Sequence, residues 1–288
     1  MERLTEILQK LNARYGAELG SKNETEEERI ERSRKAYEYL CEQENARQGD
    51  LNNFDGYDCK ICLNKGYTVV PELYLGFYQQ KQVSCKCNKA RNTIRALNRS
   101  GLADVVHNYT FEKYIATENW QKSVLTTAKQ YLDDCENHCF FFGGQTGSGK
   151  THICTAVAIA LLKRDKEVKY MLWRDEVTKL KAKVNEPDYE VEINRYKTVD
   201  VLYIDDLFKT GKTEMQKAQR PTQADINLAF EIINSRVMQK KITIISSEST
   251  LTDIIDIDES VAGRIKQSCG EYCINIAPDR NKNYRLRG

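Results

Sequence analysis

The chain contains little proline, no long apolar run and no excess of charge of one sign. Four prolines and fifteen glycines in 288 residues exclude collagen-like and low-complexity proteins. No stretch reaches the roughly 18 apolar residues of a membrane-spanning helix, so no membrane partner is expected. The net charge is +2, from 44 basic and 42 acidic residues, so a surface that binds nucleic acid has to be a local patch. Met1–Glu6 mix both charges with no apolar run behind them, which argues against a secretory signal.

Cysteine is abundant instead, with ten residues in a chain for which no export is expected. In a reducing cytoplasm such residues bind metal or are buried as thiols more often than they form disulfides, so we expect a cytoplasmic protein. Apolar residues make up 40% of the chain. At this length they suffice for a sizeable core, in one large domain or two smaller ones.

The first hundred residues are expected to form two regions. Residues 1–50 have helical periodicity, with apolar stripes at Leu4, Ile7, Leu8, Leu11 and Tyr15 and again at Ala36, Tyr37 and Leu40. These stripes favour either two helices packed on each other or a surface that docks on a partner protein. Residues 51–100 carry cysteines, glycines and aromatics, and the segment from Lys81 to Ser100 is basic. Gly101 marks the expected boundary.

Residues 101–288 alternate short β-rich runs with helical segments. The runs are His138–Phe142, Val168–Trp173, Val199–Ile204, Ile242–Ser246 and Tyr272–Ile276. Helical patterns between them include Thr151–Lys163, Asp175–Val184 and Ala224–Lys240. This alternation predicts an α/β fold, in which helices cover both faces of a parallel sheet.

A phosphate-binding loop follows the first of these runs. The pattern G-x4-G-K-T is formed by Gly144, Gln145, Thr146, Gly147, Ser148, Gly149, Lys150 and Thr151. Glycines let backbone N–H groups turn toward phosphates, and the N-terminus of the following helix adds a positive dipole end. The sequence therefore predicts ATP binding, with Lys150 on the β- and γ-phosphates and Thr151 on Mg²⁺.

Two carboxylates end the run Val199–Ile204 and have the pattern of a Walker B element. We expect Asp205 to hold the magnesium shell and Asp206 to orient or deprotonate an attacking water. These assignments predict an ATPase.

Four thiols lie in two close pairs within residues 51–100, at Cys59, Cys62, Cys85 and Cys87. Four thiolates in tetrahedral array form a closed structural zinc site, and so small a module would depend on metal for folding. Free structural thiols and an iron–sulfur cluster remain alternatives. The other six cysteines lie in apolar or helical contexts and are expected to pack in the core.

Taken together, the motifs resemble a family. The four-cysteine module, the segment Phe111–Tyr114, the phosphate loop and the run Tyr203–Leu207 are similar to DnaC/DnaI-like bacterial and phage helicase loaders. These are AAA+ ATPases close to the IstB-type transposition ATPases. The resemblance implies an AAA+ domain without a C-terminal lid, self-association through that domain, and two partners, a DnaB-type replicative helicase hexamer and single-stranded DNA.

Further roles follow from the resemblance alone. The run Ile242–Glu248 is similar to a sensor-1 strand, which commonly ends in Asn; here Glu248 stands in its place and Ser247 is a possible substitute. Arg264 resembles an arginine finger that reaches the γ-phosphate of a neighbouring subunit, and Arg236 is a second candidate for an intersubunit contact. The basic loop after Leu207 resembles an insertion near single-stranded DNA, with Phe208 as its stacking residue.

Three functions are compatible with these features. The first is ATP-dependent loading of a ring-shaped replicative helicase onto single-stranded DNA during replication initiation or restart. The second is an IstB-like ATPase that assists a transposase, against which the cysteine module and helical N-terminus argue. The third is a nucleotide-gated adaptor that hydrolyses ATP weakly, which Glu248 at the sensor position favours.

Overall fold

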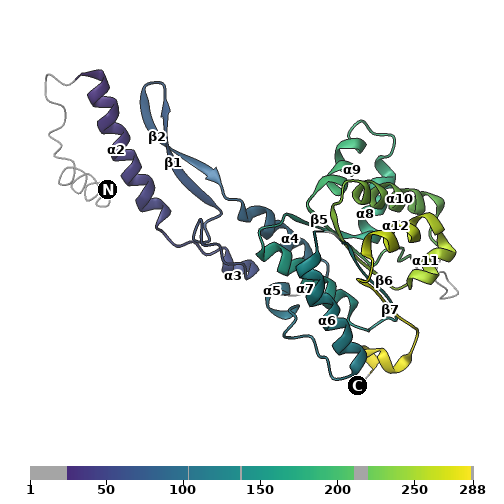
Figure 1. The fold of residues 1–288 in the computed structure, drawn as a ribbon. Coiled ribbons are helices and arrows are strands. Elements are labelled where there is room, and N and C mark those ends of the chain that lie inside the picture. The colour runs from purple at the N-terminus through teal and green to yellow at the C-terminus, as the bar shows by residue number, and fades with distance from the viewer. Residues whose placement is uncertain (1–24, 103, 137, 211–219, 287–288) are drawn as a thin grey trace. The chain divides into compact units, whose positions relative to one another are not determined.

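The chain folds into two compact units, residues 1–88 and residues 89–288. The structure, a computed structural model, describes residues 25–102, 104–136, 138–210 and 220–286 (Figure 1). The expected stripe from Leu4 to Tyr15 lies outside the described residues. The further division of the chain into three regions, with boundaries at residues 50 and 100, stays a prediction.

In the first unit, helix α2 (Glu26–Asn45) packs on a hairpin of β1 (Tyr67–Tyr74) and β2 (Phe77–Ser84). Thr25 begins the helix with a capping box, in which its side chain and that of Glu28 each accept a backbone N–H. The antiparallel strands join through Leu75 and Gly76, both of which have positive φ, as a tight two-residue hairpin turn requires. The apolar positions near the end of α2 therefore lie on a helix that packs against a hairpin.

The second unit is built on a parallel sheet, as the sequence predicts. Its strands lie in the order β4-β5-β6-β3-β7. Their bounds are Phe140–Gly144 for β3, Val168–Leu172 for β4, Val201–Asp205 for β5, Ile242–Ser247 for β6 and Cys273–Ile276 for β7. Every residue of β3, β5 and β6 is buried, which explains why these runs are mainly apolar.

Helices cover both faces of this sheet. On one face, Tyr131 of α6 packs on Phe140 of β3, and α7 lies against the central strands. On the other face, Phe141 joins a core with residues of α8, α9, α10 and α12. The remaining bounds are Asn52–Asp55 for α3, Cys87–Arg99 for α4, Val105–Asn108 for α5, Asn119–Asp134 for α6, Lys150–Lys163 for α7, Trp173–Lys183 for α8, Tyr189–Thr198 for α9, Gln223–Met238 for α10, Leu251–Ile257 for α11, Glu259–Cys269 for α12, Arg280–Lys282 for η1 and Tyr284–Leu286 for η2. This is the AAA+ P-loop fold that the sequence predicts.

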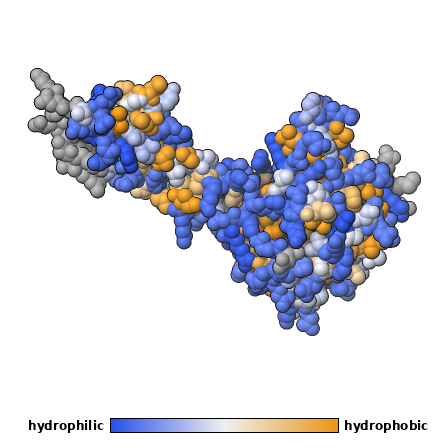
Figure 2. All heavy atoms as spheres, turned by 45° about the horizontal axis from the view of Figure 1, so that its top comes forward, coloured by the Kyte–Doolittle hydropathy of each residue, from blue (hydrophilic) through white to orange (hydrophobic). Residues whose placement is uncertain are grey.

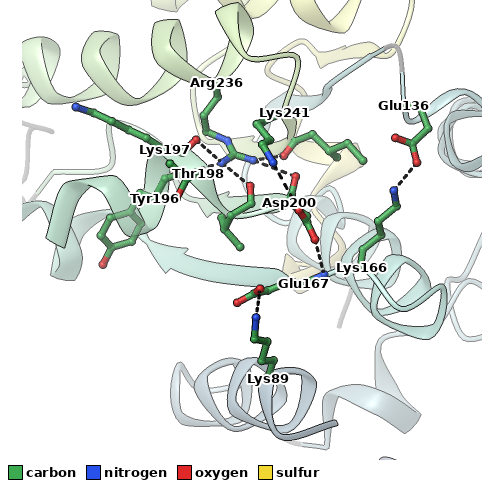
Figure 3. A network of polar contacts seen from close by, with 12 residues as sticks. Lys89, Glu136, Lys166, Glu167, Tyr196, Lys197, Thr198, Asp200, Arg236 and Lys241 are labelled. Carbon is green, nitrogen blue, oxygen red and sulfur yellow. Dashed lines mark hydrogen bonds and ion pairs between the residues drawn. The ribbon is translucent and has the colours of Figure 1, made fainter. Parts of the chain in front are cut away.

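Arg236 is a structural residue of this core, so the prediction that it contacts a neighbouring subunit is wrong. Its side chain is fully buried, and Figure 3 shows it pointing from α10 toward the segment between α9 and β5. The guanidinium donates to the carbonyl oxygens of residues 196, 197, 199, 200 and 242 and to Thr243 Oγ1. The fork of donors thus ties α10 to β6 and to the chain entering β5.

Of the six cysteines expected to pack in the core, Cys41, Cys135, Cys139, Cys154 and Cys269 are buried and Cys273 is partly buried. All six carry free thiols. Among the described helices, none has the length and hydropathy needed to cross a membrane.

Candidate functional site

The phosphate loop connects β3 to α7 with the backbone that its glycines were expected to provide. Gly144 has φ +107°, and a Cβ there would lie 2.0 Å from the carbonyl oxygen of Ile276. Gly149 has φ +87°, and a Cβ there would lie 2.8 Å from the Tyr114 ring. Glycine is therefore required at both positions by backbone conformation and by space.

Lys150 begins α7 with a buried side chain. Its Nζ donates to the carbonyl oxygens of Gly144 and Gln145, both at 2.9 Å. Burial lowers the pKa of Lys150, against the attraction of the nearby carboxylates of Glu248 and Asp206. The loop carbonyls thus hold the ammonium group inside the turn at the start of α7. An anionic ligand bound there would interact with the ammonium group and with the N-terminus of the helix.

A cavity of about 520 Å³ opens in front of the loop. Its lining includes the loop and helix residues Thr146–His152, both expected carboxylates and the aromatic side chains of Tyr109, Tyr114 and Trp120. The size falls within the range of small-molecule sites, roughly 300–1,000 Å³. A lining that combines phosphate-binding groups with aromatic rings suits a nucleotide.

Asp205 ends β5 at the carboxyl edge of the sheet and is held by three hydroxyl groups. Tyr170 donates to its Oδ2 at 2.9 Å, and Tyr203 donates to its Oδ1 at 3.0 Å. Ser246 donates to the same Oδ1 at 2.5 Å. Burial raises the pKa of Asp205, while these hydrogen bonds favour the charged form. The carboxylate is therefore fixed in orientation, and a cation nearby would favour its ionised form.

Ser246 is a site residue that sequence reasoning missed. Strand β6 lies between β3 and β5, so its end stands between the phosphate loop and Asp205. Besides its bond to Asp205, Ser246 Oγ accepts a hydrogen bond from the Asp206 backbone N–H at 2.9 Å. Ser247, which was considered as a sensor residue, is buried and donates to the Leu207 carbonyl oxygen at 2.8 Å, and it does not line the cavity. Alternation of side chains along a strand separates the two serines.

Asp206 and Glu248 both line the cavity and share one lysine. Lys209 Nζ lies 2.8 Å from Asp206 Oδ2 and 3.1 Å from Glu248 Oε1. Burial lowers the pKa of Lys209, but its bonds to the two carboxylates outweigh this effect and raise it overall. Asp206 has a left-handed backbone with φ +59°, which turns the chain sharply after β5. The sequence predicts the two carboxylates but not the lysine between them.

The segment after β7 also contributes to the site, which the sequence did not indicate. The backbone N–H of Asp279 donates to Gln145 Oε1, and that of Tyr284 donates to the Gly147 carbonyl oxygen, both at 2.9 Å. Lys282, Tyr284 and Arg285 line the cavity. Residues at the far end of the chain thus support the phosphate loop and add positive charge beside it.

Two residues predicted near partners have different surroundings. Arg264 lies on α12, partly exposed, where it donates to Gln267 at 2.9 Å; it does not line the cavity of its own chain. Phe208 is buried and packs edge-on against Trp173, with 5.8 Å between ring centroids. The prediction that Phe208 stacks on DNA bases is therefore wrong. The basic loop that follows it lies largely outside the described residues.

The four thiols of the first unit converge as their spacing predicts. Their sulfur atoms all lie within 4.8 Å of one another and all four residues are buried. The Cys59–Cys85 and Cys62–Cys87 sulfur distances are 3.8 and 3.6 Å. A tetrahedron with metal–sulfur bonds of about 2.3 Å requires sulfur atoms roughly 3.8 Å apart, so the cluster has the size of a zinc site.

A tight turn after Cys62 supports this cluster. Leu63, Asn64 and Gly66 have positive φ, and the Gly66 N–H donates to Cys62 Sγ at 3.2 Å. Burial by itself would raise the pKa of Cys62, but this bond and the neighbouring thiols lower it to about 7. Asn64 Oδ1 also accepts from the Cys59 N–H at 2.8 Å. The turn therefore favours a thiolate, which is the form that binds metal.

Comparison with known proteins agrees with this site. Residues 80–262 match the family of IstB-like ATP-binding proteins. The chain belongs to this family. XkdC from the phage-like element PBSX of Bacillus subtilis is 30% identical in an alignment of 247 residues that covers 81% of this chain and 87% of XkdC. The uncharacterized protein YqaM of Bacillus subtilis is 30% identical over 212 residues, 70% of this chain and 66% of YqaM.

The replicative helicase loader DnaC of Escherichia coli is 27% identical in an alignment of 173 residues that covers 53% of this chain and 71% of DnaC. The family resemblance inferred from the motifs is thus confirmed. The protein is an AAA+ ATPase of the IstB-like family with relatives among DnaC loaders. The family match begins at residue 80 and so leaves most of the first unit outside it.

Proposed function

We propose that this protein uses ATP to load a ring-shaped replicative DNA helicase of the DnaB type onto single-stranded DNA. The similarity to the replicative helicase loader DnaC, over 71% of that protein, carries the proposal. A nucleotide site confined to one compact unit, with a second unit free for a partner, supports it. Loading requires that nucleotide state alter the affinity for a partner, which separate units can couple.

The proposed ATPase chemistry uses the residues that line the cavity. Lys150 and backbone N–H groups of the loop Gly144–Thr151 bind the phosphates, whereas the Gln145 N–H is already bonded to the Ile276 carbonyl oxygen. Mg²⁺, when bound, would draw charge from the phosphates, and Thr151 and Asp205 are the residues that would hold it. Asp206 orients the attacking water, because it lines the cavity next to Asp205 and its backbone forms the sharp turn after β5. Ser246 holds both acidic residues in place, because its hydroxyl bonds to the Asp205 carboxylate and to the Asp206 backbone N–H.

Arg264 is proposed to complete the site of a neighbouring subunit. Its side chain is partly exposed on α12 and outside its own cavity, so it is available to a second copy of the chain. An arginine supplied in this way stabilises the charge that develops on the phosphoryl group. Hydrolysis would then depend on self-association.

The first unit is proposed to bind the helicase and to be held together by zinc on Cys59, Cys62, Cys85 and Cys87. Large apolar side chains are exposed at the hairpin turn, with exposed fractions of 58% for Tyr74, 81% for Leu75 and 67% for Phe77. Figure 2 shows apolar residues, in orange, on the surface of this unit. An exposed apolar group of this kind suits a protein partner.

A loading assay tests the proposal with the full chain. The substrate is circular single-stranded DNA coated with a single-strand-binding protein, and the measurement is the amount of DnaB-type hexamer deposited and its unwinding activity. The wild-type protein should increase deposition only with ATP, and Lys150→Ala should not. Lys183→Ala, which removes an exposed lysine that pairs with Asp188, is the matched control. No increase with the wild-type protein would contradict loading, and normal ATP turnover in Lys150→Ala would contradict the phosphate-loop assignment.

A weakly hydrolysing, nucleotide-gated adaptor is the second candidate. The shared contacts of Lys209 with Asp206 and Glu248 favour it, because they engage the carboxylate proposed to orient water. For such an adaptor, ATP turnover would stay low when single-stranded DNA and helicase are added together. Strong stimulation would favour the loader. Stimulation by a transposase, and not by a helicase, would favour the IstB-like alternative.

A further inference from the structure

The carboxyl edge of the sheet carries an unusual concentration of negative charge where a triphosphate would end. Asp205, Asp206 and Glu248 all line the cavity with the phosphate loop. Glu248 stands at the end of β6, between the strands that carry the loop and Asp205. A carboxylate at this place repels a phosphate, and a low-dielectric cavity strengthens the repulsion. A neutral amide there would have no such effect.

Lys209 is arranged to offset this repulsion. Among the described residues, it is the basic side chain within ion-pair distance of both Asp206 and Glu248, at 2.8 and 3.1 Å. The lysine also lines the cavity, together with both of these carboxylates. It follows directly on the turn after β5, and its backbone N–H donates to the Asp206 carbonyl oxygen at 2.9 Å. Its place next to the carboxylates is therefore set by the backbone.

We propose that Lys209 and Glu248 form one functional pair that replaces a neutral sensor residue in ATP hydrolysis. Lys209 is a positioning residue, and its positive charge reduces the repulsion between Glu248 and the γ-phosphate. Glu248 in turn shares the ammonium group, which keeps Lys209 from binding Asp206 alone. Lys209 contacts Asp206 Oδ2, and we propose that the other oxygen, Oδ1, interacts with water. The inference rests on the proposed role of Asp206.

The pair makes an unusual prediction about single and double substitutions. Lys209→Met leaves two carboxylates without their cation beside the γ-phosphate, and turnover should fall roughly tenfold, a screened value because both side chains are partly exposed. Glu248→Gln leaves Lys209 on Asp206 alone, so kcat should fall several-fold, whereas ATP affinity should be kept or increased because a negative charge near the phosphates has been removed. The double variant restores the net charge that Asp206, Lys209 and Glu248 have together in the wild type. It should therefore be more active than either single variant.

The measurements are kcat and KM for ATP hydrolysis, the affinity for a fluorescent ATP analogue, and the thermal unfolding midpoint of each full-length variant. Lys209→Arg should retain most activity because it keeps the charge. Lys183→Met is the matched control, since this lysine has similar exposure, pairs with Asp188 at 2.8 Å and lies outside the cavity lining. Unchanged midpoints would separate a charge effect from a folding effect.

Recovery of kcat in the double variant supports the pair. A double variant that is no more active than the single variants overturns it, as does a Lys209→Met protein with normal turnover. Asp206→Asn separates this inference from the proposed function. If Asp206→Asn hydrolyses ATP normally, the role of Asp206 fails, whatever the two other residues do. If it is inactive while the double variant shows no recovery, the pair alone fails.

Discussion

Replacing Arg236 by Met tests whether this arginine belongs to the core or to an interface. The substitution keeps an apolar stem of similar length and removes every donor of the guanidinium. Five backbone carbonyl oxygens and the Thr243 hydroxyl then lose a donor that came from a fully buried side chain. Arg236→Met should therefore destabilise the second unit strongly while leaving its cavity unchanged.

The magnitude follows from opposing contributions. Each buried polar group that loses its partner costs about 1–3 kcal/mol. The variant also removes the cost of burying a charge, the cause that lowers the pKa of Arg236 to about 10. Because the loss of several acceptors' partner outweighs this gain, a net cost of about 3–5 kcal/mol is expected. For a unit of this size, each 1 kcal/mol lowers the midpoint by about 2–4 °C, so a shift of roughly 10 °C is expected.

Thermal unfolding of the full chain, followed by circular dichroism with and without ATP, provides the assay. The transition of the second unit is the one that ATP raises, because only the folded site binds ligand. Well below the transition, ATP affinity should equal that of the wild type, since Arg236 does not line the cavity. Arg236→Lys should fall between the two, because it keeps the charge without the fork of donors.

Arg264→Met is the matched control for this experiment. Arg264 is partly exposed and donates a hydrogen bond to Gln267 on its own helix, so its removal should hardly move the midpoint. The core assignment of Arg236 is refuted by an unchanged midpoint combined with loss of the hydrolysis that depends on self-association. Such a result would return Arg236 to the intersubunit role that the sequence first suggested.

Three other predictions address the sites. One zinc per chain should be found by elemental analysis and lost in Cys59→Ser/Cys62→Ser. Retention should weaken as the pH falls, because protons compete with the metal for the thiolates, and iron with visible absorbance would contradict zinc. Ser246→Ala removes a hydrogen bond to a buried carboxylate, worth about 1.5–3 kcal/mol, so kcat should fall at least tenfold with ATP binding kept; a normal kcat would show that the serine is dispensable. Mixing Arg264→Ala with Asp206→Ala protein should restore part of the turnover, and no recovery in co-assembled protein would exclude action across subunits.

The positions of most secondary-structure elements in the second unit were predictable because their signals are local. Apolar runs of strand length identify β3, β5 and β6, and each expected strand lies within two residues of its observed start. The glycine pattern defines the phosphate loop because only glycine tolerates its backbone conformations. The paired cysteine spacing likewise predicts a cluster, since each pair is short enough to point both thiols at one centre.

Side-chain environments in the basic region after Leu207 and along α10 were not predictable from the sequence. Phe208 and Arg236 read as exposed interaction residues, since one follows a turn near basic residues and the other ends a helix. In the structure both are buried, because Trp173 and the entry to β5 lie against them. Those neighbours are distant along the chain, and no local pattern reveals them.

The sequence by itself determined which segments become strands and helices, that a phosphate loop and two acidic residues are present, and that four thiols can meet. These properties depend on backbone preference and periodicity over a few residues. Only the tertiary structure decided that β6 lies between β3 and β5, and so that Ser246 reaches Asp205 and Glu248 reaches Lys209. The order of strands in a sheet depends on how all its helices pack at once, so the contacts across its carboxyl edge exist only in the folded chain.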